Sequence, residues 1–406
     1  MTEPAPEYGT ALLLLGGVAL LSVPLRAGLG RLALPGLVAF VAVGLALSAA
    51  DSAHGLLTPF LAEQIDFLAR LGLVALLFRV GLESDLGRLA GQLRRAAAIW
   101  LPNMVVPAAL AFALIWAWPG LGPVPALLTG IAASATSIGV SVAPWQEAGA
   151  LDTDDGALML DVAELDDLSA VVLLGVVFAV APGLQEGGGL AAEALRAGAA
   201  QTGKIAAFAA ACYAFSRLAE RRLTALFTGL DPRTGPFVFA AGAVFLIAAA
   251  ADALGFSMAI GALFAGFAFS SDPEERPIDE AFAPVLALFG PFFFLSIGLS
   301  VETADIAGSA GLAAALFAVL VLGKLAGAGL PAWALAGRRT GWRIGASMIP
   351  RAEIFLVVMV HGLGLGPWAV PPELYTAAVL AALASCLLGP LLVGRLLADA
   401  PAERPA

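Results

Sequence analysis

Charged residues are scarce in this sequence, and lysine is the scarcest of them. Only 13% of the 406 residues are charged, against about 25% in an average soluble domain, and the lysines are limited to Lys204 and Lys324. Two cysteines and two histidines are too few for a disulfide framework or a histidine-based metal site. The net charge of −10 argues against nucleic acid as a partner. These shortages exclude an ordinary soluble domain and a disulfide-stabilised scaffold.

Apolar residues make up 60% of the chain and are grouped in runs of about 20, the length that a helix needs to cross a bilayer. The sequence therefore predicts an all-α polytopic membrane protein with about 13 transmembrane helices. The predicted spans are residues 9–25, 33–50, 61–82, 95–117, 124–146, 157–181, 190–216, 234–252, 255–271, 281–300, 306–335, 342–363 and 372–396.

The distribution of arginine predicts how these spans are oriented. Arginines follow the first, third, seventh, ninth and eleventh spans, whereas the loops after the even-numbered spans contain neither lysine nor arginine. Because basic loops stay in the cytoplasm, we expect the N-terminus outside and the C-terminus in the cytoplasm. The acidic loop at 147–155 is cytoplasmic by this count, but acidic residues contribute little to the rule. No basic residue precedes Arg26, so we expect no cleaved signal peptide.

Four acidic residues interrupt the apolar segment Leu158–Val176: Asp161, Glu164, Asp166 and Asp167. A carboxylate at mid-membrane costs at least about 2.5–3.5 kcal/mol, so a chain that keeps two adjacent ones has a use for them. One cation lies in a comparable setting, because Lys324 sits deep in the apolar run 311–335. We take Asp166, Asp167 and Lys324 as the candidate centre. The alternative places the acids at a helix end among the lipid headgroups.

Two other predicted spans carry residues that interrupt a membrane helix. The fifth contains a run of hydroxyl residues at 134–137, and the twelfth contains Pro350, Arg351 and Glu353 in mid-span. Spans 1–6 correspond to spans 8–13 with an odd offset, which predicts two inverted repeats with the site between the interrupted helices. Arg351 and Glu353 could compensate the helix ends at the break, although a structural ion pair is favoured over a ligand role. Taken alone, the hydroxyl run is equally explained by helix packing.

This set of groups suits the exchange of a cation for a proton. If both ions compete for one carboxylate, and the site opens to one side at a time, the competition is sufficient for exchange. Asp167, with hydroxyl and freed carbonyl oxygens of Thr136 and Ser137, offers the oxygen ligands that a hard cation such as Na⁺ needs. Asp166 would pair with Lys324, and a lysine in such a place can itself lose its proton.

Five motifs resemble those of the monovalent cation:proton antiporter-2 family, and within it those of the NapA-type sodium/proton antiporters. They are SATSIG at 134–139, LDDL at 165–168, GFSMAIGALFAG at 255–266, FFFLSIG at 292–298 and IPRAE at 349–353. The resemblance covers nearly all of residues 9–397. It implies that Asp167 is the ion-binding carboxylate and that Asp166 is the partner of Lys324. In that family, paired aspartates at this place go with electrogenic exchange.

The resemblance also implies a division into domains, with two inverted repeats whose discontinuous helices cross. A dimer domain would contain residues 9–90 and 234–300, and a core transport domain would contain residues 95–181 and 306–397. The helix at 190–216 would link them, and the core would move in an elevator-like manner within a homodimer.

Two departures from the family pattern affect the predicted centre. Glu164 stands where an apolar residue is usual and lies three residues before Asp167, so both occupy nearby faces of a helix. Asp161 continues that ridge, and either acid could add a proton or cation ligand. Ala352 replaces the more usual glycine.

We therefore expect a secondary antiporter, not an enzyme, that exchanges Na⁺ (or Li⁺) for H⁺ in a bacterial inner membrane and serves pH homeostasis. Its partners would be a monovalent cation, the proton, the lipid bilayer and a second copy of the chain, without a cofactor. The nearest alternative is K⁺/H⁺ exchange or K⁺ efflux, since oxygen ligands do not fix ion size. A sodium-coupled organic-anion symporter is a weaker alternative, because a fold does not determine function.

Overall fold

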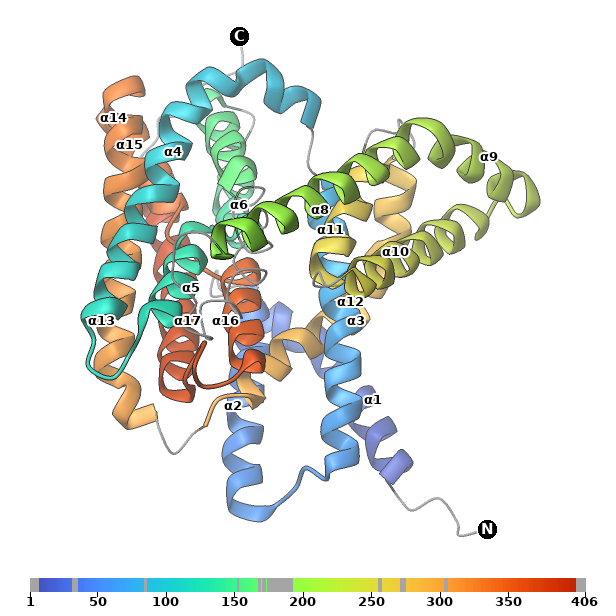
Figure 1. The fold of residues 1–406 in the computed structure, drawn as a ribbon, viewed down its shortest axis with the longest axis horizontal. Helices are drawn as coiled ribbons and strands as arrows, with labels where there is room; N and C mark the ends of the chain where they lie inside the picture. The colour runs from blue at the N-terminus through green and yellow to red at the C-terminus, as the bar shows by residue number, and fades with distance from the viewer. Residues whose placement is uncertain are drawn as a thin grey trace. The chain divides into compact units, whose positions relative to one another are not determined.

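The computed structural model describes residues 7–30, 36–83, 86–151, 153–166, 169, 173, 193–254, 258–270, 275–302 and 306–398. Every regular element in these ranges is helical (Figure 1). In the first half they are α1 (Glu7–Gly30), α2 (Gly36–His54), α3 (Pro59–Glu83), α4 (Leu86–Ala117), α5 (Pro123–Ser134), α6 (Ile138–Glu147) and a helical segment at residues 154–166. In the second half they are α8 (Glu193–Phe215), α9 (Arg221–Leu230), α10 (Gly235–Ala253), α11 (Met258–Phe269), α12 (Glu275–Leu299), α13 (Ile306–Lys324), α14 (Leu330–Ala336), α15 (Arg338–Ser347), α16 (Glu353–Leu365) and α17 (Pro372–Ala398).

These helices agree with the predicted all-α membrane architecture. Eight candidate spans among the described residues are long and apolar enough to cross a membrane, and α16 and most of α11 form shorter apolar helices. Each predicted span has a helical counterpart, although most of the span at 157–181 after residue 166 lies outside the described residues. The count of 13 therefore stays a prediction.

Helix α9 is the element that the sequence did not predict. It follows α8 through a π-helical turn, Ser216–Glu220, and its first two residues, Arg221 and Arg222, are exposed. Its ten residues are too few to cross a bilayer, so counting apolar runs of membrane length could not find it.

The chain divides into two compact units. Unit 1 contains residues 1–24, 50–87 and 175–296, and unit 2 contains residues 25–49, 88–174 and 297–406. Residues 25–49 thus belong to unit 2, whereas the predicted dimer domain placed them with the rest of 9–90. The reason is packing of α2 inside unit 2: Ser48 Oγ donates to Val301 O at 2.7 Å, and a Cβ on Gly298 would lie 2.2 Å from Val41 O. The roles of the units as dimer and transport domains stay predictions.

In unit 1, helices α3 and α11 are packed backbone to backbone. A Cβ on Gly266 would lie 2.3 Å from Phe78 O, and one on Gly81 would lie 2.2 Å from Leu263 O. The ring of Phe78 completes this contact through an edge-on approach to Phe269, with the ring centroids 6.0 Å apart. Close approach of this kind is how membrane helices associate without a hydrophobic driving force.

In unit 2, helix α4 packs closely against α13 and the turn that follows it. A Cβ on Gly323 would lie 2.8 Å from Pro107 Cα, and one on Gly327 would lie 2.6 Å from Pro102 O. Gly327 belongs to a π-helical turn, Leu325–Gly329, that separates α13 from α14. Lys324 lies between these two glycines, so its backbone is held against α4.

The Gly266→Ala variant should destabilise unit 1, because the added methyl group would overlap the backbone of α3. Overpacking of this kind typically costs about 1–3 kcal/mol. The matched control is Gly242→Ala on α10, since a Cβ there meets nothing within 4 Å. Thermal unfolding in detergent measures both; equal midpoints for the two variants would contradict the packing described here.

Candidate functional site

Two interrupted helices meet at their breaks inside unit 2. Helix α5 ends at Ser134, residues Ala135 and Ser137 have extended backbone angles (ψ 154° and 105°), and α6 begins at Ile138. Helix α15 ends at Ser347 and α16 begins at Glu353. The two breaks touch, because the Ser137 N–H donates to Pro350 O at 3.0 Å. The predicted pair of discontinuous helices is therefore confirmed.

A second set of contacts holds the helices on one side of this crossing. Ser141 Oγ of α6 donates to Ser347 O at 2.5 Å, and the indole N–H of Trp145 donates to Ser347 Oγ at 2.9 Å. All these side chains are buried. The carbonyl of Ser347, at the C-terminal end of α15, thus receives a partner from α6, as a free carbonyl at a helix end requires.

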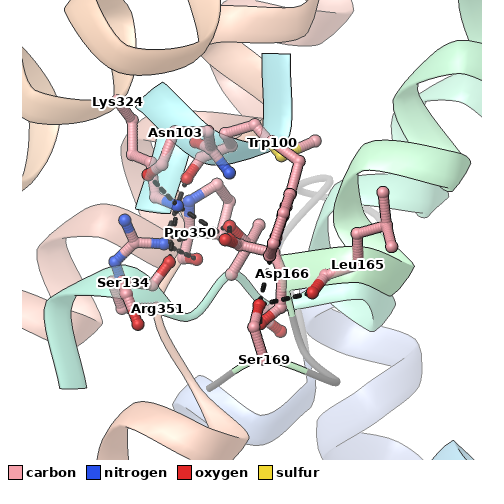
Figure 2. A network of polar contacts seen from close by, with 12 residues as sticks. Trp100, Asn103, Ser134, Leu165, Asp166, Ser169, Lys324, Pro350 and Arg351 are labelled. Carbon is pink, nitrogen blue, oxygen red and sulfur yellow. Dashed lines mark hydrogen bonds and ion pairs between the residues drawn. The ribbon is translucent and has the colours of Figure 1, made fainter. Parts of the chain in front are cut away.

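Lys324 is the buried cation at the centre of the site. Its side chain is fully buried, and its ammonium lies 2.7 Å from Asp166 Oδ2. It also donates to Ser134 O at 2.6 Å and to Asn103 O at 3.1 Å (Figure 2). These three acceptors match the three hydrogens of an ammonium group. The predicted pairing of Asp166 with Lys324 appears in the geometry as a short buried ion pair.

The two carbonyl acceptors are free because the sequence interrupts the helices that carry them. Helical hydrogen bonding would use Asn103 O to accept from the N–H of residue 107, but Pro107 has no N–H. Ser134 is the last residue of α5, so its carbonyl lies at a helix end, where acceptors have no partner within the helix. Lys324 therefore receives acceptors that an unbroken helix would not offer.

Asp166 is fully buried and has a second partner at the break of α5. The hydroxyl of Thr136 donates to the same oxygen, Asp166 Oδ2, that binds Lys324. Thr136 Oγ1 in turn accepts a hydrogen bond from Arg351 Nη1 at 3.3 Å. A chain of polar contacts thus runs from Asp166, in the helical segment at 154–166, through Thr136 at the first break to Arg351 at the second.

Arg351 and Glu353 occupy the second break, where sequence analysis placed them. The buried guanidinium of Arg351 donates to Met348 O at 3.1 Å, next to the end of α15. Glu353 is the first residue of α16, and its Oε2 accepts from Ser137 Oγ at 2.6 Å. A cation beside a helix C-terminus and an anion at an N-terminus are the stabilising arrangement. A direct ion pair between the two residues stays a prediction.

The remaining predicted residues are placed as follows. Asp167 lies outside the described residues. Asp161 is buried, with 2% of its surface exposed, and Glu164 is half-buried. In the described chain, Thr136 and Ser137 bind Asp166 and Glu353. That Thr136 and Ser137 bind Na⁺ together with Asp167 stays a prediction. A ligand role for Asp161 or Glu164 also stays a prediction.

The contribution of α4 to the site was missed from the sequence. Besides offering Asn103 O, this helix places the indole N–H of Trp100 2.9 Å from Ser169 Oγ, one turn after Asp166. A signal existed, since Pro107 stands four residues after Asn103 and announces a free carbonyl at Asn103. The sequence did not indicate which donor would bind the carbonyl of Asn103.

The Lys324→Met variant should lose about 3–5 kcal/mol of stability, because it leaves the charge of Asp166 buried without its counter-charge. The double variant Lys324→Met/Asp166→Asn should recover much of this loss, and the unfolding of each variant in detergent measures both. Arg70→Met is the matched control, since Arg70 and Asp66 form an ion pair at 2.8 Å with both side chains more than half exposed. Exposed pairs contribute about 0–1 kcal/mol. Additive losses in the double variant would contradict the coupling.

Comparison with known proteins identifies the family. The family model for "Sodium/hydrogen exchanger, transmembrane" matches residues 17–398. The chain is 24% identical over 342 residues to the high-affinity Na⁺/H⁺ antiporter NhaS3 of a Synechocystis strain, covering 81% of this chain and 70% of NhaS3. It is 26% identical over 340 residues to the Na⁺/H⁺-K⁺ antiporter GerN of Bacillus cereus, covering 81% and 82%. Its fold is similar to the sodium proton antiporter MjNhaP1 of Methanocaldococcus jannaschii, with TM-score 0.70, 13% identity and coverage of 97% and 99%. The chain therefore belongs to the transmembrane sodium/hydrogen exchanger family of cation/proton antiporters.

Proposed function

We propose that this antiporter exchanges Na⁺ (or Li⁺) for H⁺ by competition of the two ions at Asp167 and the Asp166–Lys324 pair. The observation that carries the proposal is the fully buried ion pair, 2.7 Å long, beside the crossing of two broken helices. Charges are expensive inside a membrane protein and mark ion pathways. Crossed half-helices supply carbonyl and hydroxyl oxygens to the same place.

Exchange follows if ions reach the site from only one side at a time. Arrival of a cation displaces the proton from the carboxylates, and its departure on the other side lets a proton return. We propose that the core moves in an elevator-like manner against a dimer domain, in a homodimer of a bacterial inner membrane. The N-terminus would lie outside and the C-terminus in the cytoplasm. If one net charge moves per cycle, a potential of 100 mV supplies about 2.3 kcal/mol.

K⁺/H⁺ exchange or K⁺ efflux is the second candidate. The printed description of GerN includes K⁺ as well as Na⁺, and hydroxyl and carbonyl oxygens accept either ion. Sodium-coupled organic-anion symport is less favoured. Lys324, the cation that would meet an anion at the centre, already has protein acceptors at 2.6, 2.7 and 3.1 Å.

Exchange in proteoliposomes tests the proposal directly. The liposomes are acidified inside, and collapse of the pH gradient is followed on adding Na⁺, Li⁺ or K⁺, with and without an imposed potential. A response to Na⁺ or Li⁺ that grows with the potential is expected. A response to K⁺ alone would move the protein to the K⁺ alternative, and silence with every cation would overturn exchange.

Asp167→Asn should reduce this exchange to the level of empty liposomes, because it removes the carboxylate for which cation and proton compete. The matched control is Asp66→Asn, which neutralises an exposed aspartate of α3 and should leave the rate unchanged. Both variants are assayed with the same Na⁺ pulse after confirming equal reconstitution. Full exchange by Asp167→Asn would show that the carboxylate lies elsewhere, with Glu164 the next residue to replace.

A further inference from the structure

Asn103 of α4 is a fully buried polar residue that the proposed exchange does not yet use. Its side chain has 0% exposure. Neither its Oδ1 nor its Nδ2 has a hydrogen-bond partner among the residues that the structure describes. Most buried polar side-chain atoms in proteins are hydrogen-bonded, and each exception requires an explanation such as a bound ion or water.

The surroundings of Asn103 place it beside the candidate ion site. Its own carbonyl accepts from Lys324 at 3.1 Å, and the same ammonium lies 2.7 Å from Asp166. One turn earlier on α4, Trp100 donates to Ser169 Oγ at 2.9 Å, and Ser169 donates to Asp166 O at 3.1 Å. Figure 2 shows Asn103 beside Lys324, with Trp100 and Asp166 nearby.

Asp166 provides a second buried oxygen without a hydrogen-bond partner among the described residues. Asp166 Oδ2 binds both Lys324 and Thr136, whereas Asp166 Oδ1 is buried without a hydrogen-bond partner in the described part of the chain. One carboxylate oxygen is therefore committed to the ion pair, and the other is available. Two available oxygen groups, one charged and one neutral, thus belong to residues that share the ammonium of Lys324.

We propose that the side-chain amide of Asn103 is a ligand of the transported monovalent cation, through Oδ1. The inference rests on the exchange proposed above. Oxygen ligands suit a hard cation, and a carboxamide adds such a ligand without adding charge. Asn103 thereby strengthens cation binding without adding a further carboxylate for protons to occupy. Because its backbone is held against α13 through Pro102 and Pro107, the amide enters the site from a rigid position.

The test compares Asn103→Leu with wild type, because leucine keeps a branched, buried side chain but removes the amide. The first readout is the Na⁺ concentration for half-maximal exchange at fixed pH in proteoliposomes. The second is the Na⁺ concentration for half-maximal thermal stabilisation of the purified protein in detergent. We expect both concentrations to rise about tenfold or more, the loss of one good ligand, while the pH dependence at saturating Na⁺ is kept.

The matched control is Thr376→Val on α17. Thr376 is also fully buried in unit 2, and its hydroxyl has no hydrogen-bond partner among the described residues. This variant should keep the Na⁺ dependence of wild type in both assays. An equal rise in the control would mean that loss of any buried polar group has this effect, and would overturn the assignment.

The outcomes are decisive in each case. Unchanged Na⁺ dependence in Asn103→Leu overturns the inference, and so does a shift of the pH dependence alone, which would make Asn103 a positioning residue for Lys324. If the leucine variant does not fold, Asn103→Ala, which also removes the side-chain oxygen, is titrated in the same way, and unchanged Na⁺ dependence there overturns the inference too. Wild type that binds Na⁺ in the stabilisation assay but does not exchange it overturns the proposed function, while the same assay still decides the role of Asn103. Wild type stabilised by none of Na⁺, Li⁺ and K⁺ overturns both.

Discussion

The ammonium group of Lys324 imposes the strongest constraint on unit 2. A charge removed from water must be matched by an opposite charge and by hydrogen-bond acceptors, since the desolvation cost is several kcal/mol per ion. Lys324 meets this demand with three oxygens from three separate segments: Asn103 of α4, Ser134 of α5 and Asp166 of the helical segment at 154–166. The lysine thus determines where these segments lie relative to α13. Each of these three acceptors therefore contributes to keeping the buried cation matched.

Broken helices are the means by which a membrane protein meets such a demand. An intact helix uses its interior carbonyls internally, and lipid offers no acceptors. The break at 135–137 frees Ser134 O, and Pro107 frees Asn103 O without ending α4. The second break, next to Pro350, brings Arg351 to Thr136, whose hydroxyl binds Asp166. The two carbonyl oxygens that these interruptions free, Ser134 O and Asn103 O, both accept hydrogen bonds from Lys324. The irregular backbone is therefore satisfied by protein groups.

Sequence reasoning found the residues whose chemistry is unusual for a membrane, and missed those whose role depends on packing. Asp166 and Lys324 were recognised because charge is scarce, and the helix breaks because hydroxyl residues, proline and charges stand in mid-span. Asn103 carries no charge, so only its position beside Lys324, 221 residues away in the chain, gives it meaning. The place of α2 in unit 2 depends in the same way on contacts with Val301 and Gly298. Asp167 lies outside the described residues, and its role stays a prediction.

The π-helical turn that follows Lys324 sets the angular register of this region. A π-helical turn holds one residue more than an α-helical turn, and one residue corresponds to about 100° of rotation around a helix. Residues Leu325–Gly329 therefore let Lys324 face Asp166 while α14, which continues from the same helix, faces α15. The two helices α14 and α15 lie so close that a Cβ on Gly341 would be 2.6 Å from Trp333 Cβ. The extra residue uncouples the orientation of the lysine from that of the helix after it. The number of residues in this turn is therefore as constrained as their identity. Deleting one of them would rotate α14 relative to Lys324, and either the Lys324–Asp166 ion pair or the α14–α15 contact would be lost.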